Sequence, residues 1–238
     1  MFPVRDTIPH RHFPVTTWAL IIVNTFAFLR EITLPPKVAE QFIYVFGLIP
    51  ARYTHPDWAV SVGLDPHSYW PFLTMMFLHG GWLHIIGNMW FLGIFGDNVE
   101  DRMGPLRFLL FYLLCGFVAG LVHMITNSNS TVPALGASGA IAGVMGAYLV
   151  LYPRARILAV FPIFFYPLFF EVPAVLYIGI WFLMQFLSGT AAVVSGQQAG
   201  GIAWWAHVGG FVTGLLTYWI FLRGPRSTPV LSPSPDRS

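Results

Sequence analysis

A serine flanked by small residues is the first candidate for chemistry in this sequence. Ser138 lies in the segment G-A-S-G, whose small residues allow a tight backbone turn and the close approach of another chain. A serine hydroxyl is a weak nucleophile alone and needs a base within hydrogen-bond reach. His207, in the segment A-H-V-G-G, can act as that base. Together the two segments favour hydrolysis through a serine nucleophile.

Two further polar side chains are spaced as neighbours on one helix face. His84 and Asn88 stand four residues apart in the segment H-G-G-W-L-H-I-I-G-N, which begins at His79. Both can donate hydrogen bonds to a carbonyl oxygen. With the backbone N–H of Ser138 they would form an oxyanion hole, in which each good donor stabilises the transition state by several kcal/mol.

The same segments also permit a structural interpretation. Their glycines recur at helical spacing, which is typical of closely packed helices, and His207 would then bond only to a neighbouring helix. These glycines are Gly136, Gly139, Gly143 and Gly146 around the serine, and Gly209, Gly210 and Gly214 after the histidine. Because nucleophile, base and donors occur together, catalysis is the favoured interpretation.

A zinc site is the rival chemistry for the histidines. His79, His84 and His207 are possible ligands, but the sequence has no H-E-x-x-H motif and no carboxylate lies among them. We therefore expect neither a metal nor a cofactor.

The composition predicts that these residues lie in a membrane protein. Of the 238 residues, 56% are hydrophobic and 9% charged, with a mean hydropathy of +0.66, which fits a soluble protein poorly. The twelve Lys and Arg are scattered singly, so there is no basic stripe to indicate nucleic acid. The single cysteine, Cys115, lies in an apolar run and is expected to serve packing.

The pattern of apolar segments predicts an all-α integral membrane protein with six spans. At about 1.5 Å per residue the fourth segment falls short of a ~30 Å hydrocarbon core, so we expect it to begin below the membrane surface. The predicted spans are residues 13–34, 82–99, 106–124, 136–152, about 168–187, and 203–222.

Three connecting segments differ in character. Residues 37–74 form a long first loop whose aromatic side chains predict a partly membrane-embedded structure at the headgroups. Prolines interrupt the stretch from residue 157, which predicts an interfacial connector before the fifth span. Residues 188–201 form a loop of Gly, Ser and Gln that we expect to cap the site.

Charge distribution predicts three regions and their orientation. Residues 1–14 are expected to be a cytoplasmic N-terminus, 15–222 the membrane domain, and 223–238 a disordered cytoplasmic tail. With six spans, nine arginines share one side against three basic residues on the other, which predicts that both termini are cytoplasmic. The nine are Arg5, Arg11, Arg102, Arg107, Arg154, Arg156, Arg223, Arg226 and Arg237, against Arg30, Lys37 and Arg52.

This topology brings the polar candidates to one depth. The second, fourth and sixth spans all begin on the non-cytoplasmic side, so His84, Ser138 and His207 fall in the same half of the membrane. Strongly polar side chains at that depth are costly and usually face an interior cavity with a function. A shared cavity is therefore expected.

Several motifs in order resemble the rhomboid family of intramembrane serine proteases. The resemblance covers all six spans and implies Ser138 as nucleophile, His207 as base, and His84 with Asn88 as oxyanion donors. It implies a Ser–His dyad without a catalytic aspartate that cleaves single-span membrane proteins near their outer ends. For this mechanism we expect no cofactor, and we expect the fifth helix to gate access from lipid. Further positions resemble structural elements of the family: His79, Gly136, Gly139, Gly96-x3-Glu100-x3-Gly104, Gly210 and Gly214.

Two positions depart from the family pattern. Ala142 stands where many members have a tyrosine against the catalytic histidine, and Pro71 follows Trp70 where an arginine is common. They put in doubt the packing of His207 and the anchoring of the first loop.

An inactive relative that binds transmembrane segments is the leading alternative. A transporter would predict charged pairs or an internal repeat, and neither is found. We expect a prokaryotic plasma-membrane protein.

Overall fold

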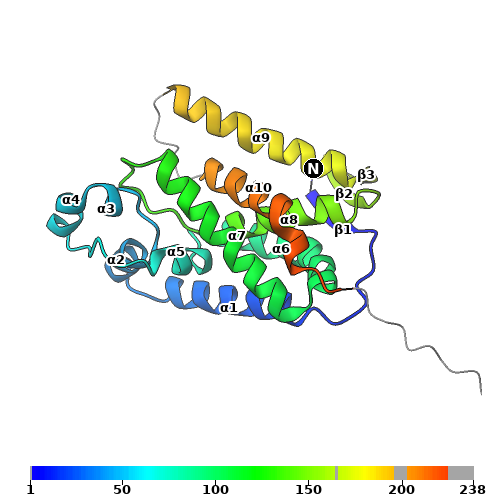
Figure 1. Cartoon of the computed structure of the whole chain (residues 1–238), viewed down its shortest axis with the longest axis horizontal. Helices are drawn as coiled ribbons and strands as arrows, with labels where there is room; N and C mark the ends of the chain where they lie inside the picture. Colours follow the sequence, from blue (N-terminus) through cyan, green and yellow to red (C-terminus); the bar gives the residue numbers. More distant parts are fainter. Residues whose placement is uncertain (1, 164–165, 196–202, 225–238) are drawn as a thin grey trace, which may run out of the picture.

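Six long helices dominate the structure, a computed structural model that describes residues 2–163, 166–195 and 203–224. Figure 1 shows them side by side, with α9 at the edge. By length and composition three helices in the described part can cross a membrane: α1, α7 and residues 174–192 of α9. The six are α1 (Val15–Ile32), α6 (Trp82–Met103), α7 (Pro105–Thr126), α8 (Ser138–Leu151), α9 (Ala174–Ser195) and α10 (Trp204–Phe221).

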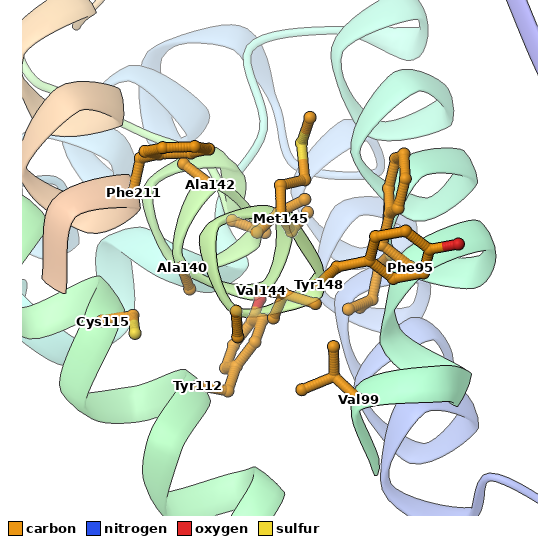
Figure 2. Close-up of a cluster of buried hydrophobic side chains, with 14 of the residues drawn as sticks. Phe95, Val99, Tyr112, Cys115, Ala140, Ala142, Val144, Met145, Tyr148 and Phe211 are labelled. Carbon is orange, nitrogen blue, oxygen red and sulfur yellow. The ribbon is translucent and has the colours of Figure 1, made fainter. Parts of the chain in front are cut away.

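Helix α8 is the centre of the bundle. Every residue from Gly139 to Tyr148 is buried, as expected for a helix that is apolar all round. Figure 2 shows it surrounded by side chains of three other helices. These are Phe95 and Val99 of α6, Tyr112 and Cys115 of α7, and Phe211 of α10, all part of one core. Cys115 thus has the packing environment that was predicted.

The segment between α1 and α6 folds into short helices. They are α2 (Pro36–Phe46), α3 (Ala51–Thr54), α4 (Pro56–Ser61), α5 (Pro71–Thr74) and the 3-10 helix η1 (Met75–Phe77). Arg52 is buried and ties the segment together by donating to the carbonyl oxygens of Asp65 at 2.8 Å and Val45 at 2.9 Å. Pro71 is buried at the first position of α5, where its missing N–H leaves no helical bond unmade.

A small sheet corrects the all-α prediction. Strands β1 (Phe2–Asp6), β2 (Arg156–Ile163) and β3 (Tyr166–Pro173) pair antiparallel in the order β1-β2-β3. The N-terminus is therefore partly a strand, and the interfacial connector is a hairpin. The prediction that the fifth helix starts near residue 168 is wrong, because Pro173 would interrupt it and strand pairing satisfies the backbone instead.

Two helix ends also differ from the predicted ones. Helix α6 continues through Glu100 to Met103, because the Glu100 carboxylate is buried and fully hydrogen-bonded. Helix α9 continues to Ser195, so the described part of the predicted 188–201 loop, residues 188–195, is helical rather than a loop. Residues 196–202 and the predicted tail from residue 225 lie outside the described residues.

Candidate functional site

The structure brings Ser138 and His207 into direct contact. Ser138 is the first residue of α8, and His207 lies in the first turn of α10. Ser138 Oγ and His207 Nε2 are 2.7 Å apart, within the distance of a good hydrogen bond. With Ser138 donating to Nε2, the imidazole is placed to take the hydroxyl proton.

Close packing between α8 and α10 fixes this pair. A methyl group at Gly210 would overlap the carbonyl oxygen of Gly139, and one at Gly214 would overlap that of Gly143. The two helix backbones are therefore in contact, as in small-residue packing between membrane helices. The glycines serve the structural role that was one of the two interpretations, and that role positions the serine and histidine.

A glutamine that the sequence analysis did not select lies on the other side of the imidazole. Gln185 of α9 is 7% exposed, and its Oε1 is 2.7 Å from His207 Nδ1. The detectable signal was its position as a polar residue in an apolar helix, which indicates an interior-facing side chain. Its partner is 22 positions away in the chain, so spacing alone did not point to it.

Aromatic rings from two helices surround His207. The ring centroid of Trp181, on α9, is 5.8 Å from that of His207, and that of Trp204 is 6.4 Å away in an edge-on arrangement. Ala142, which departs from the family pattern, is fully buried in the core. The rings near the histidine therefore come from α9 and α10 and not from position 142.

A cavity of about 460 Å³ opens onto the serine and histidine. Its walls come from α6, α8, α9 and α10. A volume of this size accommodates a small ligand or a short stretch of extended peptide. The polar groups that line it are His84, Asn88, Ser138, Gln185 and His207.

His84 and Asn88 face the turn that leads into the serine. Gly136 has φ +116°, and a methyl group there would lie 2.6 Å from His84 Nε2 and 3.4 Å from Asn88 Nδ2. Glycine is thus needed both for the backbone conformation and for the space. Asn88 lines the cavity, and its Nδ2 is buried and has no hydrogen-bond partner within the described residues, so this donor is unpaired beside the cavity.

His79 lies behind His84 rather than in the cavity. It is fully buried, its ring centroid is 5.1 Å from that of His84, and its backbone N–H donates to Glu31 Oε2 at 3.3 Å. It therefore packs against a residue of the site without lining it. In the part of the chain that the structure describes, no three His, Cys, Asp or Glu side chains are grouped to hold a metal ion.

Glu100 connects α6 to α1 and lies outside the cavity. Its carboxylate accepts the backbone N–H groups of Thr16 and Thr17, each at 2.8 Å, and the Thr17 hydroxyl at 2.9 Å. These N–H groups belong to the first turn of α1 and have no partner inside that helix. The carboxylate also complements the positive end of the helix dipole. A methyl group at Gly96 would lie 3.1 Å from Thr17 Oγ1, so α6 and α1 pack closely here and this motif joins the two helices.

Comparison with known proteins identifies relatives over most of this structure. A profile of the Rhomboid domain matches residues 66–224. RHOMBOID-like protein 6, mitochondrial, of Arabidopsis thaliana is 31% identical over 202 residues, which cover 84% of this chain and 58% of that protein. Putative rhomboid protease YdcA of Bacillus subtilis is 32% identical over 140 residues, which cover 55% of this chain and 70% of that protein. Rhomboid protease GluP, also of Bacillus subtilis, is 40% identical over 119 residues, which cover 47% of this chain and 23% of that protein.

These relatives bear on the predicted source and on the family. They include mitochondrial and chloroplastic proteins of Arabidopsis thaliana as well as bacterial ones, so they do not support the prediction of a prokaryotic plasma membrane. The chain spans about three fifths of the mitochondrial relative and a quarter or less of several others. The profile match covers most of the chain, including the serine, the histidine and both oxyanion candidates. The chain belongs to the rhomboid family.

Proposed function

We propose that this chain is an intramembrane serine endopeptidase that cleaves transmembrane segments of single-span membrane proteins. The observation that carries the proposal is the 2.7 Å separation of Ser138 Oγ and His207 Nε2 beside a cavity. A neutral imidazole in this contact activates a serine hydroxyl for attack on a carbonyl carbon.

The proposed reaction proceeds through an acyl-enzyme. Ser138 Oγ attacks the scissile carbonyl while His207 Nε2 takes its proton and then passes it to the leaving amine. His84, Asn88 Nδ2 and the Ser138 N–H stabilise the oxyanion. A water molecule, deprotonated by His207, then hydrolyses the ester. The free donor of Asn88 supports its assignment to the oxyanion.

We further propose that all six long helices span the membrane, with both termini on the cytoplasmic side. Three arginine-containing ends meet at one end of the bundle: the Arg223 N–H donates to the Arg102 carbonyl at 3.0 Å, and Arg107 donates to that of Leu222 at 2.6 Å. Helix α8 has 14 residues, or roughly 21 Å at 1.5 Å per residue, against a hydrocarbon core of ~30 Å. Ser138 at its start would therefore lie below the opposite surface.

The names of relatives support both this proposal and its alternative. Two of the Bacillus relatives carry protease in their names, whereas an Arabidopsis relative, 32% identical over 85 residues, is named inactive. An inactive binder of transmembrane segments would not need the contact between Ser138 and His207. That contact favours the protease.

Reconstitution in liposomes with a labelled single-span substrate tests the proposal. Wild-type protein should cleave the substrate, and Ser138→Ala and His207→Ala should each abolish cleavage while still binding it. If the wild-type protein bound a panel of transmembrane segments and cleaved none, the chain would be a binder instead.

A further inference from the structure

Gln185 is a buried amide whose position the proposed dyad alone does not explain. It lies in α9 and is 7% exposed, although the neighbouring positions of this helix are apolar. Burying an amide is unfavourable unless its polar atoms are hydrogen-bonded. The bonds that it makes therefore indicate why it is there.

Those bonds determine which way the amide faces. Its Nε2 donates to the carbonyl oxygen of Trp181 at 3.3 Å, one turn earlier in the same helix. Its Oε1 lies 2.7 Å from His207 Nδ1. An amide oxygen can only accept a hydrogen bond, so the proton of the neutral imidazole is on Nδ1. Nε2 then carries the lone pair, and it is the nitrogen next to Ser138.

Other groups near His207 do not take over this role. The titratable groups that face it are His84 of α6 and His123 of α7. The His123 ring is 3.3 Å from the Asn127 side chain, and Trp181 and Trp204 contact His207 through their rings. Among the described residues, Gln185 is the side chain hydrogen-bonded to Nδ1.

We propose that Gln185 is a positioning residue that holds His207 in the tautomer and orientation in which it acts as the base. The proposal rests on the proposed protease function and adds a third member to the dyad, supplied by α9. A group that orients the base is a general feature of such sites, and a neutral amide serves in this way when paired with a Cys–His dyad.

The location of Gln185 ties this orientation to the position of α9. The same helix forms one wall of the cavity through Trp181 and Gln185, and it packs on α10 through a stacked pair, Phe182 and Phe211, with centroids 4.4 Å apart. Its opposite face is exposed, including Leu176, Leu183 and Met184. If α9 moves outward to admit a substrate, Gln185 leaves Nδ1. In that case the base would be oriented only after α9 had closed again.

Kinetics of three variants in liposomes test the proposal. Gln185→Leu should lower kcat about 10- to 100-fold and change KM less than about twofold, a smaller loss than the ~10⁴ for a charged orienting group. Gln185→Glu keeps an acceptor on Nδ1 but adds a charge that stabilises the imidazolium. The acid limb of its kcat/KM profile should move about one pH unit or more to higher pH, with activity retained above it. Met184→Leu, at an adjacent position that is 52% exposed, should resemble the wild type.

Nitrogen-15 NMR of histidine-labelled protein provides a readout that does not depend on turnover. The wild-type protein should show His207 protonated on Nδ1, and Gln185→Leu should show a mixture of tautomers. A wild-type imidazole protonated on Nε2, a wild-type kcat in Gln185→Leu, or an unmoved acid limb in Gln185→Glu would overturn the proposal. If wild-type protein cleaved nothing, the proposed protease function would be wrong. The NMR measurement of the His207 tautomer would still show whether Gln185 orients the imidazole.

Discussion

Helix α10, which carries His207, and helix α9, which contacts the His207 imidazole, are held in the bundle in different ways. Helix α10 contacts α8 backbone to backbone at Gly210 and Gly214, where even a methyl group has no room. Helix α9 is held by large rings, such as Phe182 on Phe211, and leaves its other face exposed. Backbone contacts of this kind allow little relative movement, whereas stacked rings can slide or separate. The nucleophile and base are thus on the rigid side, and the group that orients the base is on the adjustable side.

The largest effect is expected where the rigid side is disturbed. Gly214→Ala would push a methyl group into the carbonyl oxygen of Gly143, and no flexible side chain can move away to relieve the overlap. We expect a loss of about 3 kcal/mol or more in unfolding free energy and a fall in cleavage of at least about 100-fold. Thermal unfolding in detergent and the liposome assay measure both.

The matched control for that variant lies on α9. A methyl group at Gly179 would meet no atom within 4 Å, and alanine is the better helix former. Gly179→Ala should therefore retain wild-type stability and cleavage. Equal damage from both substitutions would contradict the difference between the two helices.

The next largest effect concerns the oxyanion. Asn88→Ala removes a buried donor that has no partner within the described residues. Because the donor acts only when the oxyanion forms, kcat should fall about 100-fold with little change in KM. A steady-state comparison with wild type provides the measurement. A rise in KM at constant kcat would instead assign Asn88 to substrate binding.

A smaller effect is expected from filling the cavity opposite α9. Gly87 of α6 lines the cavity, and an added Cβ would meet nothing within 4 Å, so Gly87→Leu should fold normally. We expect about a 10-fold loss in kcat/KM for a transmembrane substrate, because the side chain occupies peptide space. Gly93→Leu is the control, since Gly93 is equally open but lines a separate groove beside α1 and the N-terminus. If both variants behaved alike, substrate would not use this cavity.

The smallest effect concerns the sheet from which α9 starts. Asp6 of β1 accepts hydrogen bonds from the Tyr148 hydroxyl and from Asn98 Nδ2, and burial raises the pKa of its carboxyl above 3.8. A raised pKa in the folded state means that stability falls as pH rises from 3.8 through that pKa. Asp6→Asn should remove this part of the pH dependence of the unfolding free energy. The part removed should be less than about 1 kcal/mol, because the carboxyl is partly exposed and screened by solvent. Thermal unfolding of both proteins from pH 4 to 7 tests this prediction. If stability depended on pH equally in the variant and the wild type, the prediction would be wrong.

Residues that combine a chemical type with a local motif were predictable from the sequence. Ser138, His207, His84 and Asn88 stand in short segments whose glycines or helical spacing carry the signal, and the structure brings them to one cavity. The six long helices were likewise visible as apolar segments, with boundaries that shifted where a buried group or a proline intervened.

Features that depend on partners distant in the chain were not predictable in the same way. Gln185 reads as one polar position in an apolar helix until α10 places His207 beside it. The strand β1 forms because residues near 157 lie next to it, and its five residues carry no strong alternation by themselves. Long-range pairing supplies the stabilisation in both cases, so local pattern is insufficient.

The most direct test of the central claim is covalent labelling of the serine by a fluorophosphonate in liposomes, mapped by mass spectrometry. We predict an adduct on Ser138 in the wild-type protein and its loss in His207→Ala. Absence of an adduct on Ser138, or labelling that does not depend on His207, would contradict the claim that this contact activates the serine.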